Sequence, residues 1–510
     1  MKKLMIMIMA AFPMFAIAQN SVNIKVDSIG KLATLLGDQK FKISELTVSG
    51  DVNGTDLKLI QEIVTRTKTD KKNPDECLVT AIDLSGITIV ESKDKGGLKT
   101  QANTLPKGIF SGAKNLTKVV LPESITAIEA EAFQNCENLT TINLPTGLMS
   151  LGNEAFEGCK NLAAIQLPSG LKEIASQAFN KCEKIAAIEL PEGVGEIGSS
   201  AFEDCKSLVS INLANISKLG NSAFKDCNSL KEVTLNDLSM IGQSVFSGCT
   251  SLETVKMEGA LADLNISVFK GCTSLISISL PSSLKEISSH AFDDCQSLAE
   301  IAIPESVVKI KDSAFQKCSS LKTVHLPSGL TNLGDDAFED CSSLESVTGL
   351  TLLNEIETNV FRNCGNLRKV ELPATVKRIG SNAFNGCSLL SDIEWPNVLK
   401  TIEDGAFEKC ASLQSVNLPN GLKSIGSDAF KGCIQLSSID LPATVKEIGG
   451  SAFQNCSALT AIIINSGTPP SISSSSFKGT NAAILIPKGS RAIYSADKKW
   501  SKVKGLKENK

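Results

Sequence analysis

A phenylalanine recurs along most of this chain at an almost constant spacing. Seventeen phenylalanines lie at positions 110, 133, 156, 179, 202, 224, 246, 269, 292, 315, 338, 361, 384, 407, 430, 453 and 477, and thirteen of the sixteen intervals are 23 residues long. A period in the twenties is typical of a small unit that stacks on copies of itself, because one unit cannot bury its apolar face alone. The spacing therefore predicts one solenoid, although a length of 510 residues would suggest about three globular domains.

The unit at residues 139–159 shows what each repeat is expected to form. Ile142 and Leu144 alternate with polar residues, which predicts a short strand with these two side chains inward. Pro145 ends the strand because proline has no N–H for a hydrogen-bonded ladder. Apolar residues three and four apart around Phe156 predict one or two turns of α or 3₁₀ helix.

The repeated sequence resembles the leucine-rich repeats of the BspA-like class, whose units have the consensus L-P-x-x-L-x-x-I-G-x-x-A-F-x-x-C-x-x-L-x-x-I. The resemblance covers residues 101–465. It implies a leucine-rich-repeat solenoid of the α/β repeat class, with a parallel sheet on its concave face and short helical turns on its convex face. The class occurs among exported and surface proteins of host-associated bacteria, some of which act as adhesins, and the resemblance implies a similar setting for this chain.

Both ends of the repeat array depart from its pattern. Divergent strand motifs at 43–48 and 79–84 flank an amphipathic helix, which we expect Thr55 or Asp56 to cap. A last strand at 484–486 is followed by a charged segment. A stack of repeats exposes an apolar end unless a polar-faced structure covers it, so we interpret both flanks as caps. The expected divisions are an N-terminal cap with two divergent repeats at 19–100, the repeats at 101–465, and the last coil with a C-terminal cap at 466–510.

Residues 1–18 are predicted to be a signal peptide. Lys2 and Lys3 precede an apolar run, and Ala16 and Ala18 form a small-x-small cleavage site. The run is too short for a transmembrane helix, and no later segment reaches the necessary length. We therefore expect an exported protein without a transmembrane segment, located in the periplasm, at the cell surface or in the medium.

The net charge of the chain limits the classes of partner that we expect it to bind. A formal net charge of −4 argues against a nucleic-acid-binding protein, which normally has a basic face. The basic residues that cluster in the C-terminal tail are Lys498, Lys499, Lys502, Lys504, Lys507 and Lys510. We interpret this cluster as a solvated chain end, and contact with an anionic surface is the alternative.

Fifteen of the sixteen cysteines follow a repeat phenylalanine by three residues. Many cysteines in an exported protein would ordinarily indicate disulfides. Equivalent residues of neighbouring coils, however, lie about 5 Å apart with parallel Cβ vectors, whereas a disulfide brings the Cβ atoms to about 3.8 Å. We therefore expect free, buried thiols. The chain has no Cys-x-x-Cys and no histidine or acidic residue that accompanies this column, so no metal site is predicted.

The sequence offers little for catalysis. Its two histidines, His290 and His325, are expected on different faces of the repeat unit. No Gly-x-Ser-x-Gly, phosphate-binding loop or His-Glu-x-x-His pattern is present. We therefore predict neither catalytic residues nor a cofactor, and we expect that the protein is not an enzyme.

Function is expected at the outward positions of the strands, because solenoids usually bind along them. Two outward columns begin at Thr141 and Asn143, contain no aromatic residue, and become more acidic toward the C-terminal half. The residues predicted to form a binding face are Lys369, Glu371, Asp392, Glu394, Asn417 and Asp440. Its ligand would be a protein or a glycan, with host molecules among the candidates.

Two interpretations of the whole chain follow. The first is a non-catalytic exported leucine-rich-repeat protein that mediates macromolecular binding or adhesion through its concave sheet face. The alternative is a structural scaffold or spacer of the cell envelope with no specific ligand. The sequence indicates no particular oligomeric state.

Overall fold

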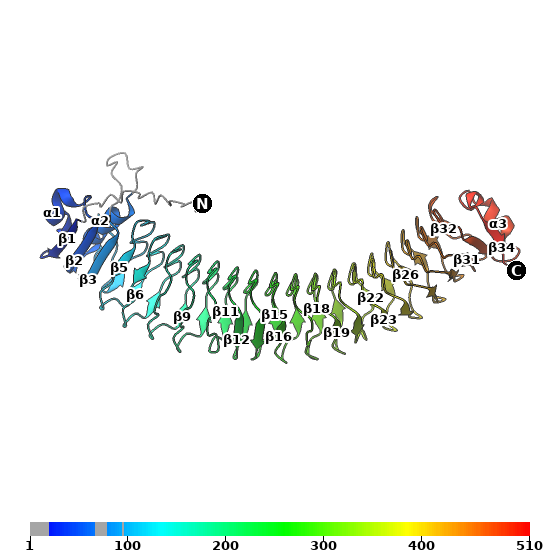
Figure 1. Cartoon of the computed structure of the whole chain (residues 1–510), viewed down its shortest axis with the longest axis horizontal. Coiled ribbons are helices and arrows are strands. Elements are labelled where there is room, and N and C mark those ends of the chain that lie inside the picture. The colour runs from blue at the N-terminus through cyan, green and yellow to red at the C-terminus, as the bar shows by residue number, and fades with distance from the viewer. Residues whose placement is uncertain (1–19, 67–78, 94–95, 510) are drawn as a thin grey trace, which may run out of the picture. The chain divides into compact units, whose positions relative to one another are not determined.

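The computed structural model describes residues 20–66, 79–93 and 96–509. The predicted signal peptide at 1–18 lies outside the described residues, as does Cys77. The chain divides into two compact units, Met1–Pro168 and Ser169–Lys510. Each unit is a stack of coils, as the period predicted (Figure 1).

A complete coil contains two short strands, of which the sequence predicted only the first. In one coil these are β14 (Thr254–Met257) and β15 (Asp263–Leu264). In β14, Val255 and Met257 are buried and the two residues between and before them are exposed, which confirms the predicted alternation. Equivalent strands of neighbouring coils pair in parallel, so each unit has a first strand column, which includes β14, and a second strand column, which includes β15.

In the unit Met1–Pro168, the two columns form two sheets. The first column consists of β1 (Ser21–Val26), β2 (Glu45–Val52), β3 (Ala81–Ile89), β5 (Lys118–Val120) and β7 (Thr141–Ile142). The second column consists of β4 (Thr104–Leu105), β6 (Ala127–Ile128) and β8 (Ser150–Leu151).

In the unit Ser169–Lys510, each column is broken into three sheets. The first column consists of β12 (Glu232–Leu235), β14 and β16 (Ser277–Ser279), then β19 (Thr323–His325), β21 (Ser346–Thr348), β23 (Lys369–Glu371) and β25 (Asp392–Glu394), then β27 (Ser415–Val416), β29 (Ser438–Leu441), β31 (Ala461–Ile464), β33 (Ala483–Ile486) and β34 (Leu506–Glu508). The second column consists of β9 (Glu173–Ile174), β10 (Glu196–Ile197), β11 (Lys218–Leu219) and β13 (Met240–Ile241), then β15, β17 (Glu286–Ile287), β18 (Lys309–Ile310) and β20 (Asn332–Leu333), then β22 (Glu355–Ile356), β24 (Arg378–Ile379), β26 (Thr401–Ile402), β28 (Ser424–Ile425), β30 (Glu447–Ile448) and β32 (Ser471–Ile472). Whether the first column lines a concave surface stays a prediction.

The segment around each repeat phenylalanine is a turn, and the helical turns expected there are not formed. At Phe202, the flanking residues Ser200 and Asp204 have φ angles of 52° and 61°. Left-handed residues on both sides interrupt a helix, whose residues all have negative φ. The backbone N–H of Phe202 donates instead to the carbonyl of Ala223 in the next coil, at 2.8 Å. Hydrogen bonds between coils therefore replace bonds within a helix.

Phenylalanine and cysteine form the centre of the stack. The rings of Phe315 and Phe338 are stacked with centroids 5.3 Å apart and 3° between their planes, and other successive rings are arranged similarly. The fifteen cysteines of the column are free and buried, as predicted. Each described thiol contact has one form, in which Sγ donates to a phenylalanine carbonyl of the preceding coil, as from Cys318 to Phe292 at 3.2 Å. The cysteines therefore serve as small core side chains and as weak hydrogen-bond donors.

Two helical segments accompany the first strands of the N-terminal unit. They are α1 (Leu32–Leu36), followed by a 3₁₀ turn at Gly37–Gln39, and α2 (Gly54–Thr65). The cap of α2 is Asn53, so the expectation of Thr55 or Asp56 is wrong. Asn53 Oδ1 accepts the N–H groups of both residues, and the carboxylate of Asp56 accepts the N–H of Asn53, which completes a capping box. The chain enters the helix earlier than the apolar pattern indicated because this reciprocal bonding satisfies its first amides.

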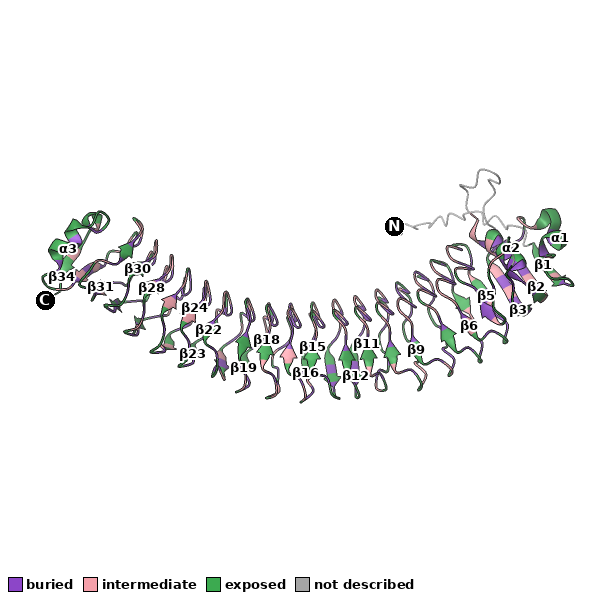
Figure 2. Ribbon diagram, turned by 180° about the vertical axis from the view of Figure 1, so that it is seen from behind, coloured by how far each residue is buried: buried purple, intermediate pink, exposed green. Residues whose placement is uncertain are grey.

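The C-terminal segment packs on the last coil of its unit. It contains α3 (Arg491–Ala496), a 3₁₀ turn at Trp500–Lys502 and β34, which pairs with β33. Most residues of α3 are exposed (Figure 2), but Tyr494 and Trp500 are buried with their ring centroids 4.8 Å apart. Tyr494 Oη donates to the carbonyl of Ser466 and Trp500 Nε1 to that of Pro470, both at 2.7 Å. The two rings thus anchor the segment to the coil.

Candidate functional site

Four of the six predicted binding residues lie side by side on two paired strands. β23 and β25 pair so that Lys369 is opposite Asp392 and Glu371 is opposite Glu394. All four side chains are exposed. Lys369 Nζ lies 2.9 Å from Glu371 Oε1 and 3.6 Å from Glu394 Oε1. The hydrogen bond and the charge of Glu371 raise the pKa of Lys369, so this lysine is held as a cation among the carboxylates.

The other two predicted residues lie on the next sheet. Asn417 directly follows β27 and Asp440 is part of β29, whereas β23 and β25 belong to the sheet that ends at β25. Both side chains are exposed, and the side-chain amide of Asn465 donates to Asp440. The six residues, which we call the acidic stretch, contain four carboxylates and one ammonium group and have a formal charge of −3. The structure therefore gathers them on one column but not in one sheet or one pocket.

The first strand column is hollowed at a different place, which sequence reasoning did not select. The cavity has a volume of about 670 Å³, and we call it the strand-face hollow. Its outward lining residues are Ala187, Glu189, Ser210, Asn212, Glu232 and Thr234. The size is within the range of ligand pockets, which run from roughly 300 to 1,000 Å³, but no aromatic residue lines this hollow.

The hollow coincides with a gap in the hydrogen-bonded ladder. Ala187 and Ser210 pair through one isolated bridge, and the next extended strand of this column begins at Glu232. Alanine is depleted in strands because its methyl group packs little surface against neighbouring strands. The adjacent alanines at 186 and 187 are the sequence signal that would have indicated this gap.

His290 and His325 lie apart in different polar groups, and the sequence predicted this separation. His325 is on β19 with Nδ1 2.9 Å from Thr348 Oγ1 and Nε2 3.6 Å from Glu305 Oε1. All three side chains are exposed on the strand face or beside it. The 3.6 Å contact with Glu305 is longer than a hydrogen bond and all three groups are exposed, so the contacts are those of a surface polar group.

His290 belongs to a separate polar group at the Phe292 turn. Its Nδ1 lies 3.1 Å from Asp293 Oδ2, which also forms an ion pair with Lys270 Nζ at 2.9 Å. The carboxylate of Asp293 is 5% exposed, and the Lys270 ammonium offsets part of the cost of burying it. The spacing His-x-x-Asp is the signal that sequence reasoning missed here. Within the described chain, no further side chain hydrogen-bonds this imidazole.

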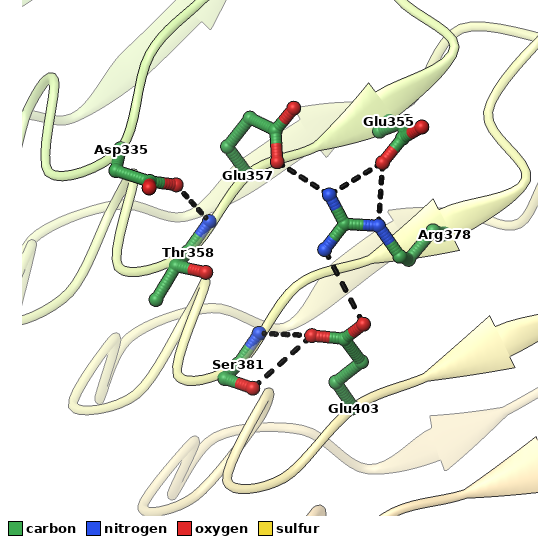
Figure 3. Close-up of polar contacts among 7 residues, drawn as sticks. All are labelled: Asp335, Glu355, Glu357, Thr358, Arg378, Ser381 and Glu403. Atoms are coloured by element: carbon green, nitrogen blue, oxygen red, sulfur yellow. Dashed lines mark hydrogen bonds and ion pairs between the residues drawn. The ribbon is translucent and has the colours of Figure 1, made fainter. Parts of the chain in front are cut away.

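An ion-pair network crosses three coils of the second strand column (Figure 3). The Arg378 guanidinium on β24 contacts the carboxylates of Glu355 and Glu357 from one neighbouring coil, and its Nη1 lies 3.3 Å from Glu403 Oε1 of the other. Glu403 also accepts the N–H and the hydroxyl of Ser381, each at 3.1 Å. Partial burial lowers the pKa of Arg378, but the hydrogen bonds and charges of the carboxylates outweigh it and raise this pKa overall. The guanidinium therefore links the coils as a permanent cation.

Two searches of the described residues concern other kinds of site. Over 20–66, 79–93 and 96–509, no group of three or more His, Cys, Asp or Glu is placed to hold a metal ion. In the same ranges, no helix has the length and apolarity that crossing a membrane would require. The candidate surfaces described above, the acidic stretch and the strand-face hollow, both lie on the first strand column.

Stacked coils with a period of 23 and parallel strands of inward leucine, isoleucine and valine define a leucine-rich-repeat solenoid. The sequence matches the family described as "BspA type Leucine rich repeat region (6 copies)" over residues 103–231, 151–276, 263–391 and 379–495. These matches span most of the chain. The protein belongs to the BspA-type leucine-rich-repeat family.

Several solved bacterial structures are similar to this chain. A leucine-rich repeat protein from Bacteroides ovatus is 30% identical, with 66% of this chain and 82% of that chain covered and a TM-score of 0.53. A leucine rich cell surface protein from Faecalibacterium prausnitzii is 28% identical, with 54% and 87% covered and a TM-score of 0.39. The pneumococcal vaccine antigen PcpA is 21% identical, with 83% and 84% covered and a TM-score of 0.31. Among curated proteins, none matches this chain.

Proposed function

We propose that this protein is a non-catalytic, exported binding protein whose first strand column holds a macromolecule, either a protein or a glycan. The observation that carries the proposal is the exposed, polar character of the outward positions over successive strands, as in β12, β14 and β29. Such a surface extends over several repeats. Solenoids use surfaces of this kind for partners that span several repeats.

The charge of the acidic stretch indicates the chemistry of the partner. Lys369 already contacts Glu371 and Glu394, which leaves a formal excess of negative charge around Asp392 and Asp440. Exposed carboxylates steer oppositely charged partners and set specificity more than affinity. A protein segment that presents lysine or arginine side chains is therefore the ligand that this stretch fits best, and a glycan would instead use the polar hydroxyls and amides of the column.

A charge-reversal experiment tests the acidic stretch. Immobilised matrix proteins and glycans are screened by surface plasmon resonance with the wild-type protein and with the variant Glu371→Lys/Glu394→Lys/Asp440→Lys. The matched control, Glu173→Lys/Asp263→Lys/Glu447→Lys, makes the same charge change at exposed residues of the second strand column. We expect the first variant to bind a ligand found in the screen at least about tenfold more weakly, and the control to bind it normally.

Retained binding by both variants would exclude the acidic stretch as the site. Ser210→Arg/Asn212→Arg then tests the strand-face hollow, because two long side chains would fill it without changing the inward residues. Loss of binding in that variant alone would move the site to the hollow. Retained binding there as well would refute the first strand column as the binding surface.

Export has its own test. We propose cleavage after Ala18, and the similar protein from Faecalibacterium prausnitzii is described as a cell surface protein. N-terminal sequencing of the mature protein from fractionated cells should begin at Gln19. Recovery of the chain in the cytoplasmic fraction with Met1 retained would contradict export.

A structural scaffold without a specific ligand is the second candidate. The pairing of Lys369 with Glu371 and of Asn465 with Asp440 favours it, because these polar groups already satisfy one another. A scaffold would self-associate in size-exclusion chromatography with light scattering and would show no ligand in the screen. A monomeric protein that binds one ligand through the first strand column would exclude this candidate.

A further inference from the structure

The C-terminal segment leaves a cavity against the last coil of its unit. We call it the C-terminal cavity, and its volume is about 480 Å³, which is in the range of small-molecule pockets. Its apolar wall comes from Ile472 of β32, Phe477, Ile484 of β33 and Val503. These four residues come from both the last coil and the C-terminal segment, so the cavity exists only because the segment packs where it does.

Phe477 differs from the other phenylalanines of the repeat. The sixteen before it are buried, whereas Phe477 is only partly buried. Trp500 packs at a tilt on its ring, with centroids 5.6 Å apart, and no described phenylalanine of a following coil stacks on the other side. An aromatic surface at the end of the stack is therefore available inside the cavity.

The cavity is preformed because its outer wall is anchored. The hydrogen bond from Trp500 Nε1 to the carbonyl of Pro470 and that from Lys499 Nζ to the carbonyl of Ile472, at 2.7 and 2.6 Å, tie the segment to the coil. Asp497 caps the 3₁₀ turn by accepting the N–H groups of Lys499 and Trp500 at 2.8 and 3.0 Å. These two bonds lower the pKa of Asp497 and keep it ionised. A ligand would thus meet a fixed site.

Lysines surround the apolar wall, and no aspartate or glutamate belongs to the lining. The lining lysines are Lys478, Lys498, Lys499, Lys502 and Lys504. All five are exposed, and none has a carboxylate within 4.0 Å in the described part of the chain. This concentration of positive charge stands out in a chain whose net charge is −4. Like charges around one small cavity repel each other, and a bound anion would relieve that repulsion.

We propose that the C-terminal cavity binds a small amphipathic organic anion. The acyl chain or ring of the ligand lies on Phe477 and Val503, and its carboxylate or phosphate lies among the lysines. Both parts are needed, because the wall offers too little surface to hold a neutral hydrocarbon tightly and exposed lysines hold a simple anion only weakly. A free fatty acid and a lipid of an anionic membrane share this chemistry, and we assign the cavity to the free, monomeric form because its lining is concave. The proposal uses no residue of the first strand column's candidate surfaces.

Isothermal titration calorimetry tests the proposal on the mature chain. The ligands are decanoate below its micellar concentration, the uncharged decan-1-ol and acetate. The charge variant is Lys498→Gln/Lys502→Gln/Lys504→Gln, and the matched control, Lys184→Gln/Lys377→Gln/Lys446→Gln, makes the same change at exposed lysines elsewhere. A third variant, Val503→Trp, fills the cavity without changing charge.

We expect decanoate to bind at one site and more tightly than decan-1-ol or acetate. Binding should weaken about tenfold in the charge variant and with added salt, should be lost in Val503→Trp, and should be unchanged in the control. Equal decanoate affinity in all four proteins, or equal affinity for decanoate and decan-1-ol, would overturn the proposal. Flotation with phosphatidylglycerol vesicles without any binding of monomeric decanoate would also overturn it, in favour of contact with a membrane surface.

Discussion

Truncation of a single core phenylalanine should reveal how strongly the stability of one coil depends on its contacts with the adjacent coils. Phe315 is fully buried, and its ring stacks on Phe292 and on Phe338 with centroids 5.2 and 5.3 Å away. Replacement of a buried phenylalanine by alanine typically costs about 3–5 kcal/mol. Each stacked pair adds roughly 0.5–1.5 kcal/mol beyond its buried area. We therefore expect Phe315→Ala to cost about 5 kcal/mol, at the upper end of the range.

Phe477→Ala is the matched comparison at the end of the stack. Its ring is partly exposed and has one described aromatic neighbour, Trp500. Less surface returns to water and one ring contact is lost, so we expect a cost of about 2 kcal/mol. The difference between the two variants, about 3 kcal/mol, corresponds to about a hundredfold in an equilibrium constant.

Hydrogen exchange is the suitable assay for this pair. A long stack of repeats can unfold in parts, so one midpoint from a denaturant titration does not give one free energy. Protection of the amides at residues 290–340 should fall in Phe315→Ala, and protection at 453–486 should fall less in Phe477→Ala. Equal losses in the two variants would refute the reasoning, because stability would then not depend on burial between two coils.

Three further changes test the cysteine column, the helix cap and the Arg378 network. Burial raises the pKa of Cys456 to about 11 from 9.0. Because the folded pKa is raised, the stability contributed by the neutral buried thiol is complete below pH 9 and is lost as pH rises through 11. Iodoacetamide should therefore label Cys456 slowly at pH 8, and rapid labelling would contradict this. Asn53→Ala should cost about 1 kcal/mol and expose the first amides of α2 to hydrogen exchange, whereas Asn53→Asp should retain them; equal losses would argue against the capping box. Arg378→Ala should lower the free energy of local opening around residues 355–403 by about 1 kcal/mol, and by less at high salt; unchanged hydrogen-exchange protection of these amides would show that the network contributes nothing.

Much of the fold could be predicted from the sequence because the information is local and repeated. The inward positions of the first strands, the buried phenylalanines and the buried free cysteines all follow from a single period. The turns around phenylalanine could not be predicted by apolar spacing alone. Ser200 and Asp204 adopt left-handed backbone there, and Phe202 bonds to a coil about 20 residues ahead, so the competing hydrogen bonds come from outside the segment.

The candidate sites, like the fold, could be predicted from the sequence only in part. Outward positions such as Glu371 and Asp392 could be identified from the alternation, and their exposure is confirmed. Their use as a binding face stays a prediction. The strand-face hollow depends on how closely two neighbouring strands pair at Ala187 and Ser210, which no single repeat specifies.

The sequence by itself determined the class of fold, the family and the sorting of inward and outward columns, because each of these depends on residues within one repeat. Only the tertiary structure decided how the C-terminal segment, which lies outside the repeats, packs on the last coil. The lysines of the tail were interpreted as a solvated chain end, yet the C-terminal segment folds back and places Lys498 and Lys502 beside Phe477. The physical reason is that Tyr494 and Trp500 find their hydrogen-bond partners about 30 residues earlier in the chain, and such long-range contacts have no periodic signal.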